Sequence, residues 1–259
     1  VALLAVSDLD RIQLFGSDIG HRALPMIHIP TTAGTGSEVT PYSILTNHEK
    51  QTKKSIASDC LFPQYAFLDA KYMQSISHDV MVNTAIDALS HSVEGMLSVK
   101  ANIMSDIVAA EAIRLISSQF KNLKEGIADK EILLYAAMLG GVVISQTKTT
   151  AVHAMGYPLT YFKNIDHGRA NGLLLGEFMK YTEKYEPLRV KKILSAMGIE
   201  NTAEFKNIFI ELLGKRDNFS VDELEMYSYI SEDTGGVKNS IHRPNVDEIL
   251  EIYTKSLID

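Results

Sequence analysis

The spacing of apolar residues changes near residue 75, and this change constrains the fold of the 259-residue chain more than any other feature. Before it, apolar runs have the length of strands and are separated by turn residues: "PMIHIPT", "YSILTN", "KKSIAS" and "QYAFLDA". After it, apolar residues recur with a helical period, first at Val82, Ile86, Leu89, Val93 and Leu97. We therefore predict a partial α/β domain over residues 1–75 and an all-α domain over residues 76–259.

Start and stop signals divide the helical part. Ser220 and Asn245 each precede Val-Asp-Glu, which predicts that a helix begins after each of them. Tyr157-Pro158 predicts an interruption, because proline lacks the N–H that a helix interior requires. Gly168 predicts a tight turn before the next helix.

Charge and composition argue against several classes of protein. The net charge of −7 disfavours a broad nucleic-acid footprint. No run of about 18 apolar residues occurs, so we expect no membrane span. Cys60 is the single cysteine and has no partner for an internal disulfide, which fits a reducing compartment. We expect a cytoplasmic protein.

Asp87 and His91 stand four residues apart in the first long helical segment. Residues at i and i+4 share one helix face, so both side chains can point at one ion. His153 and His167 would complete a set of three imidazoles and one carboxylate, which suits a divalent metal such as Zn²⁺ or Fe²⁺. Taken alone, this spacing is more often explained by a surface pair or a satisfied core contact. The apolar residues around Asp87 favour a partner for a buried carboxylate, which makes the metal interpretation equal to these, and both stay open here.

The segment "PTTAGTGSE", Pro30 to Glu38, consists mainly of small residues and predicts a loop. Its backbone N–H groups, glycines and hydroxyls can cradle a phosphate. It matches neither the Walker A pattern nor the G-x-G-x-x-G fingerprint. A tight surface turn is the alternative interpretation.

Four segments occur in a distinctive order: "IPTTAGTGSEVTPYSILTN", "FLDA", "AIDALSHSVEGMLS" and "AVHAMGYPLTYFKNIDHGRANGLLL". In this order they resemble the iron-containing (group III) alcohol dehydrogenase family. The resemblance continues to the C-terminal "NVDEILEIYTKSLI". It implies a dehydroquinate-synthase-like architecture, in which residues 1–75 are a remnant of a Rossmann-like N-terminal domain and an all-α C-terminal domain follows.

The resemblance also implies chemistry and site residues. Members interconvert a small alcohol and its aldehyde with NAD or NADP, on Fe²⁺ or sometimes Zn²⁺, and many are homodimers or larger oligomers. The positions that match the family's metal ligands are Asp87, His91, His153 and His167. The positions that match its nucleotide-binding segment are Thr31, Thr32, Gly34, Thr35 and Lys53.

Two departures from the family pattern bear on activity. Many members carry a histidine four residues after the third ligand, where this chain has Tyr157. An ordinary tyrosine pKa near 10 makes its hydroxyl a hydrogen-bond donor rather than a base, so we assign Tyr157 a donor role at the substrate. The family's "GGGS"-type phosphate loop has no counterpart in these residues, and "VALLAV" resembles the helix that follows it. We expect a processed or truncated product.

Three functions fit these observations. The first is a metal-dependent, NAD(P)-linked dehydrogenase of small primary alcohols. The second is a glycerol-dehydrogenase-like zinc oxidoreductase, although such relatives use fewer histidine ligands. The third is a non-catalytic metal-binding remnant or oligomerisation partner. We expect no nucleic-acid or membrane partner.

Overall fold

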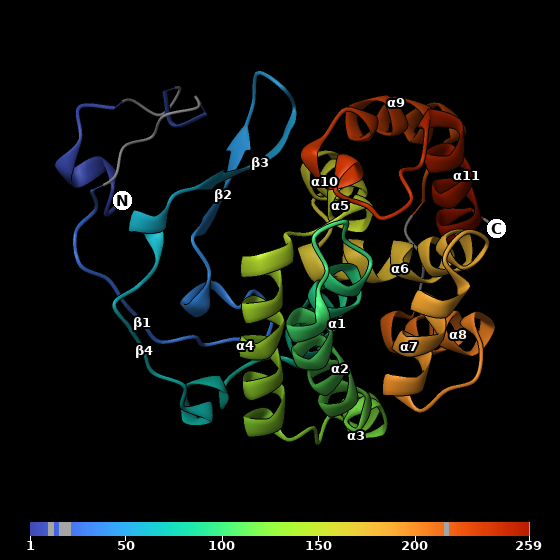
Figure 1. The fold of residues 1–259 in the computed structure, drawn as a ribbon, viewed down its shortest axis with the longest axis horizontal. Helices are drawn as coiled ribbons and strands as arrows, with labels where there is room; N and C mark the ends of the chain where they lie inside the picture. Colours follow the sequence, from blue (N-terminus) through green and yellow to red (C-terminus); the bar gives the residue numbers. More distant parts are fainter. Residues whose placement is uncertain (10–12, 16–21, 215–217, 259) are drawn as a thin grey trace.

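A computed structural model describes residues 1–9, 13–15, 22–214 and 218–258. In Figure 1 the segment up to about residue 75, in blue and cyan, lies beside the helices that follow it. Short 3-10 helices punctuate that segment: η1 (Leu4–Val6), η2 (Gln13–Phe15), η3 (Ser37–Val39), η4 (Asp59–Leu61) and η5 (Ala70–Met73).

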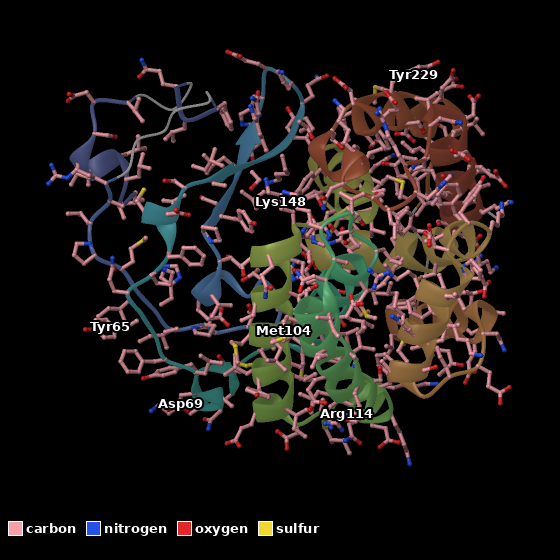
Figure 2. The ribbon with its side chains drawn as sticks, viewed as in Figure 1. Tyr65, Asp69, Met104, Arg114, Lys148 and Tyr229 are labelled. Atoms are coloured by element: carbon pink, nitrogen blue, oxygen red, sulfur yellow. The ribbon has the colours of Figure 1, made fainter. Side chains whose placement is uncertain are left out.

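Each of the four predicted strand runs overlaps a strand. The short strands β1 (Ile27–His28) and β4 (Tyr65–Ala66) pair in parallel. The longer strands β2 (Tyr42–Asn47) and β3 (Thr52–Ala57) form an antiparallel hairpin. Tyr65, at the outer edge of the molecule in Figure 2, is 63% exposed, and Ile27 on β1 is 61% exposed. The parallel pair therefore contributes little to the core.

The α-helices follow in sequence: α1 (His78–Met96), α2 (Ile103–Ser117), α3 (Phe120–Glu125), α4 (Lys130–Thr147), α5 (Ala151–Lys163), α6 (His167–Glu183), α7 (Pro187–Met197), α8 (Thr202–Leu213), α9 (Val221–Glu232), α10 (Gly235–Lys238) and α11 (Val246–Leu257). The predicted caps of α9 and α11 are confirmed, because Ser220 and Asn245 each complete a capping box with the glutamate three residues later.

Helix α1 is the centre of the core and packs against α2, α4 and α6. Its apolar residues Ile86, Leu89 and Val93 are fully buried. Each buried side chain of this size stabilises the fold by roughly 1.5–3 kcal/mol. The polar residues that α1 carries between them are therefore held at fixed positions inside the molecule.

The predicted helix break at Tyr157-Pro158 is wrong, since α5 continues through Pro158 to Lys163. Proline leaves the carbonyl four residues earlier, that of Ala154, without its helical donor. The Ser231 hydroxyl lies 3.4 Å from that oxygen and 2.8 Å from the Tyr227 carbonyl, so its single proton is shared between the two. The Tyr253 hydroxyl donates to the neighbouring Met155 carbonyl at 2.6 Å. Hydroxyls from α9 and α11 thus lie against the turn of α5 in which proline removes a helical hydrogen bond.

The chain instead changes direction after Asn164, which caps α5 in the left-handed region at φ 55°. Gly168 does not form the predicted turn, because it lies in the first turn of α6. A Cβ at Gly168 would stand 1.9 Å from the carbonyl oxygen of Asn83 on α1. Glycine is therefore needed here for the close approach of α6 to α1.

Within the described residues, no single helix combines the length and apolar composition needed to cross a membrane. Helices α4 and α5 meet that criterion only when taken together, and their axes are bent by 110°.

Candidate metal centre

Four predicted ligand residues converge on one point between α1, α5 and α6. Around Oδ1 of Asp87, the Nε2 atom of His91 lies at 3.9 Å. The Nε2 atoms of His153 and His167 each lie at 3.7 Å. The candidate ligand atoms of Asp87, His91 and His153 lie within 4.8 Å of one another, and His167 stands outside this group of three although it lies close to Asp87. The folded chain thus brings together residues that are up to 80 positions apart.

Helix positions explain this convergence. Asp87 and His91 share a face of α1 at the predicted i, i+4 spacing. His153 lies in the first turn of α5, and His167 is the first residue of α6. Asp166, which precedes α6, accepts a hydrogen bond from Nδ2 of Asn83 on α1 at 2.9 Å. This bond fixes the start of α6, and with it His167, against α1.

Three of the four side chains in the cluster are buried and the fourth is partly exposed. The side chains of Asp87, His91 and His153 are 5%, 6% and 4% exposed. The side chain of His167 is 33% exposed. His167 is therefore the member of the cluster that is most accessible to solvent.

The geometry fits a divalent metal ion. Metal–ligand bonds of about 2.1 Å in a tetrahedron place the ligand atoms about 3.4 Å apart. The separations of 3.7–3.9 Å around Asp87 are a few tenths of an ångström longer. Three imidazoles and one carboxylate are also a donor set that binds zinc and iron. In the described chain the Nδ1 atom of His91 has no hydrogen-bond partner.

The buried charges shift the pKa of the candidate ligands in different directions. Burial lowers the pKa of His91 to about 4, and burial also lowers the pKa of His167. Burial by itself would raise the pKa of Asp87, but the nearby imidazoles hold it below its usual range. Burial opposes the charged form of His153, yet Glu94 outweighs this and raises its pKa. Near neutral pH, Asp87 is thus ionised while His91 and His167 are neutral.

Sequence reasoning missed two polar residues of this cluster. Asn171, one turn after His167 on α6, donates from Nδ2 to Oδ1 of Asp87 at 2.9 Å. The same nitrogen lies 3.2 Å and 3.4 Å from Nε2 of His153 and His167. Glu94, on α1, accepts a hydrogen bond from Nδ1 of His153 and is fully buried. Glu94 lies seven residues after Asp87, on the same helix face, and that spacing was the available signal.

The predicted nucleotide loop packs between α1 and α4. A Cβ at Gly34 would stand 2.8 Å from Cβ of Thr84, one turn before Asp87. The side chains of Thr31 and Thr35 are exposed, and Thr32 is half-buried. The loop therefore presents hydroxyls to solvent about one helical turn from the histidine cluster.

Lys53, on β3, donates to Oγ1 of Thr46 at 2.9 Å across the hairpin. Its positive charge contributes to the lowered pKa of His167, although burial is the larger cause. The hairpin thus brings the predicted lysine toward the open side of the cluster.

Two aromatic residues of α5 lie on the side that faces the cluster or the hairpin. The ring of Tyr157 stacks on that of His167, with centroids 5.6 Å apart and planes 10° apart. The Tyr161 hydroxyl lies 3.3 Å from Nδ1 of His48 at the end of the hairpin. Phe162 stacks instead on Tyr227, with centroids 5.2 Å apart, and packs against the core.

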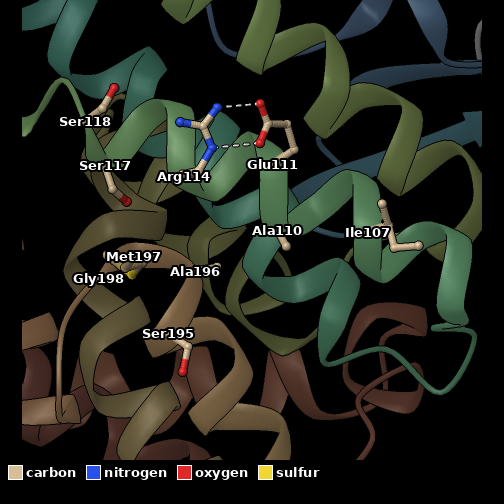
Figure 3. A pocket seen from close by; sticks show the side chains of 10 residues that line it. All are labelled: Ile107, Ala110, Glu111, Arg114, Ser117, Ser118, Ser195, Ala196, Met197 and Gly198. Carbon is tan, nitrogen blue, oxygen red and sulfur yellow. Dashed lines mark hydrogen bonds and ion pairs between the residues drawn. The ribbon is translucent and has the colours of Figure 1, made fainter.

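A surface hollow of about 890 Å³ lies elsewhere, between α2 and the end of α7 (Figure 3). Glu111 and Arg114 form an ion pair there, with side chains 45% and 58% exposed. Exposed pairs of this kind contribute little free energy. None of the predicted site residues lines the hollow, so the histidine cluster is the candidate for chemistry.

Comparison with known proteins identifies the family. The model of the C-terminal part of the Fe-containing alcohol dehydrogenase family matches residues 81–216, which is more than half of the chain. The chain belongs to the iron-containing alcohol dehydrogenase family. A second model, described as iron-containing alcohol dehydrogenase, matches residues 1–70. The resemblance inferred from the four sequence segments is thus confirmed.

Relatives within the iron-containing alcohol dehydrogenase family cover the chain well. Long-chain-alcohol dehydrogenase 1 of Geobacillus thermodenitrificans is 37% identical over 204 residues, 76% of this chain and 51% of that protein. An iron-containing alcohol dehydrogenase of Thermotoga maritima superposes with a TM-score of 0.88 at 37% identity, over 99% of this chain and 70% of that one. Sulfoacetaldehyde reductase of Bifidobacterium kashiwanohense, solved with NAD⁺, gives a TM-score of 0.86 at 28% identity, over 99% and 72%.

The chain spans about half the length of the curated relatives it matches. These solved relatives and the helices between residues 78 and 257 confirm an all-α C-terminal domain of this family's type.

Proposed function

We propose that the chain is the metal-binding part of an NAD(P)-linked dehydrogenase that interconverts a small primary alcohol and its aldehyde. The observation that carries this proposal is the convergence of three histidine Nε2 atoms on Oδ1 of Asp87 in a member of the iron-containing alcohol dehydrogenase family. A divalent cation, Fe²⁺ or Zn²⁺, supplies a Lewis acid that stabilises negative charge on the substrate oxygen, and NAD or NADP carries the hydride.

The residues of the chain prepare the site for that chemistry. Asp87 is ionised and offsets the charge of a cation, while the imidazoles of His91 and His167 offer lone pairs. His153 offers one once the ion displaces its proton. Burial of three of the four side chains excludes water from all but one side. The substrate approaches at the exposed edge of His167, beside the ring of Tyr157.

Tyr157 acts in this proposal as a hydrogen-bond donor to the substrate. Burial raises the pKa of Tyr157, so its hydroxyl keeps its proton. Tyr157→Phe keeps the ring and removes the donor, and loss of one such bond costs about 1 kcal/mol, or roughly fivefold in kcat/KM. A variant with unchanged kcat and KM would refute the donor role.

We also propose that residues 1–75 belong to a Rossmann-like nucleotide-binding domain, with the boundary to the all-α domain at residue 75. The parallel pairing of β1 with β4 supports this proposal. The proposed nucleotide contacts are Thr31, Thr32, Gly34, Thr35 and Lys53. Their support is the distance of one helical turn between the loop and Asp87, and the charge of Lys53 near His167.

Turnover tests the proposal directly. Protein loaded with Fe²⁺ or Zn²⁺ is mixed with NAD⁺ or NADP⁺ and a series of straight-chain primary alcohols, and formation of reduced nicotinamide is followed by absorbance. We expect turnover that Asp87→Asn abolishes. His78→Ala is the matched control, because His78 also lies on α1 but bonds the Leu123 carbonyl instead. Absence of turnover with both metals and both nucleotides would overturn the proposal.

A further inference from the structure

The Glu94 carboxylate accepts its hydrogen bonds from residues at the start of α5. Its Oε1 atom accepts from the backbone N–H of Thr150 and from the Thr150 hydroxyl, each at 2.8 Å. The backbone N–H of His153 lies 3.3 Å from the same oxygen. Its Oε2 atom accepts from Nδ1 of His153. The carboxylate is fully buried, so these contacts replace all of its hydration.

The contacts to the backbone N–H groups of Thr150 and His153 make Glu94 the cap of α5. Thr150 stands at the N-cap position, but its own side chain makes no capping bond. Unpaired N–H groups at the start of a helix need an acceptor, and a negative charge there is favourable. Glu94 supplies both from another helix, α1. This is why a buried carboxylate is tolerated at this point of the core.

The contact between Oε2 of Glu94 and Nδ1 of His153 orients a candidate metal ligand. With Nδ1 donating its proton to Glu94, the lone pair of His153 is on Nε2, which lies 3.7 Å from Oδ1 of Asp87. A carboxylate behind a ligating histidine fixes the tautomer and ring orientation and strengthens the donor. Together with Asp87 it also gives the centre two negative charges, which matches a divalent cation.

We propose that Glu94 is a positioning residue of the metal centre, which aims Nε2 of His153 at the cation while it caps the helix that carries His153. This inference rests on the proposed function. It adds that the start of α5 and the metal affinity depend on one carboxylate, although Glu94 itself does not reach the ligand atoms of the other histidines.

The experiment measures binding of Zn²⁺ and Co²⁺ to the purified protein and to Glu94→Gln. We expect the variant to bind Zn²⁺ 10- to 100-fold more weakly, the usual effect of losing such a partner. We also expect its Co²⁺ absorption spectrum to shift, because the ring of His153 is no longer fixed.

Two variants separate capping of α5 from positioning of His153. Thr150→Val removes one donor to Oε1 but leaves the His153 contact, so we expect lower stability with unchanged metal affinity. Glu177→Gln is the control for burial, because Glu177 is 6% exposed but pairs with Lys206 of α8 and not with a candidate metal ligand. It is expected to bind Zn²⁺ as the unmodified protein does.

The outcomes are distinct. If the unmodified protein binds neither ion, the proposed function fails and this inference fails with it. If it binds both, and Glu94→Gln matches its affinity and spectrum, Glu94 is a helix cap only and the inference alone is overturned. If Glu94→Gln does not fold, Glu94→Asp is measured instead. It keeps the charge but draws the carboxylate away from His153, and the same loss of affinity is expected.

Discussion

Gly168→Ala tests whether the close approach of α6 to α1 builds the metal centre. The added Cβ would stand 1.9 Å from the Asn83 carbonyl oxygen and 3.0 Å from Cβ of Asp87. The first separation falls short of an ordinary 3.4 Å contact by about 1.5 Å. Overpacking of this kind costs about 1–3 kcal/mol of folding free energy.

The same displacement acts on the ligands. Gly168 follows His167 directly, so moving the start of α6 by about 1.5 Å moves His167 by several times the roughly 0.2 Å that metal–ligand distances tolerate. We therefore expect Gly168→Ala to bind Zn²⁺ at least tenfold more weakly, in addition to the loss of stability.

The assay pairs urea denaturation with a Zn²⁺ titration against a chromophoric chelator. Gly235→Ala is the matched control, because a Cβ at this helical glycine meets no atom within 4 Å. It should be as stable as the unmodified protein or slightly more stable. Unchanged Zn²⁺ affinity in Gly168→Ala, with stability within about 0.5 kcal/mol, would refute the reasoning.

Two further predictions concern protons and the proline helix. Zn²⁺ affinity should fall about tenfold per pH unit below the raised pKa of His153, because the ion displaces a proton that the metal-free protein holds there; a titration from pH 6 to 8 that shows no dependence would contradict this. His91 has a pKa of about 4, so a second proton should compete with Zn²⁺ only in acid. Ser231→Ala should cost about 1 kcal/mol in urea denaturation, and less in a Pro158→Ala background, where residue 158 supplies an N–H to Ala154. Equal costs in both backgrounds would exclude that role for Ser231.

Local patterns predicted much of the fold because they act over a few residues. The hairpin strand Tyr42–Asn47 coincides with the predicted run "YSILTN". The capping boxes at Ser220 and Asn245 depend on side chains three residues apart, and both form. The domain boundary at residue 75 stays a prediction.

Contacts between distant segments account for the errors. Pro158 reads as a helix breaker until the hydroxyls of Ser231 and Tyr253, 73 and 95 residues later, approach the weakened turn. Gly168 was predicted to form a turn because nothing nearby in the sequence indicates that the Asn83 carbonyl lies against it.

Helical spacing singled out the pair of Asp87 and His91, and residue type made His153 and His167 candidates to complete the set. The resemblance then matched all four to the family's ligands. The residues that hydrogen-bond to these ligands could not be named from the sequence. Glu94 bonds the N-cap residue Thr150 across 56 residues, and Asn171 reaches Asp87 across 84 residues. A ligand pattern indicates which atoms touch a metal but not which groups orient them.

Metal content most directly tests the central claim that these histidines form a metal centre. The protein and its His153→Ala variant are purified anaerobically and their iron and zinc are measured by elemental analysis. The account predicts about one ion per chain in the unmodified protein and loss of that ion in the variant. Absence of metal from the unmodified protein, even after reconstitution with Fe²⁺ or Zn²⁺, would contradict it.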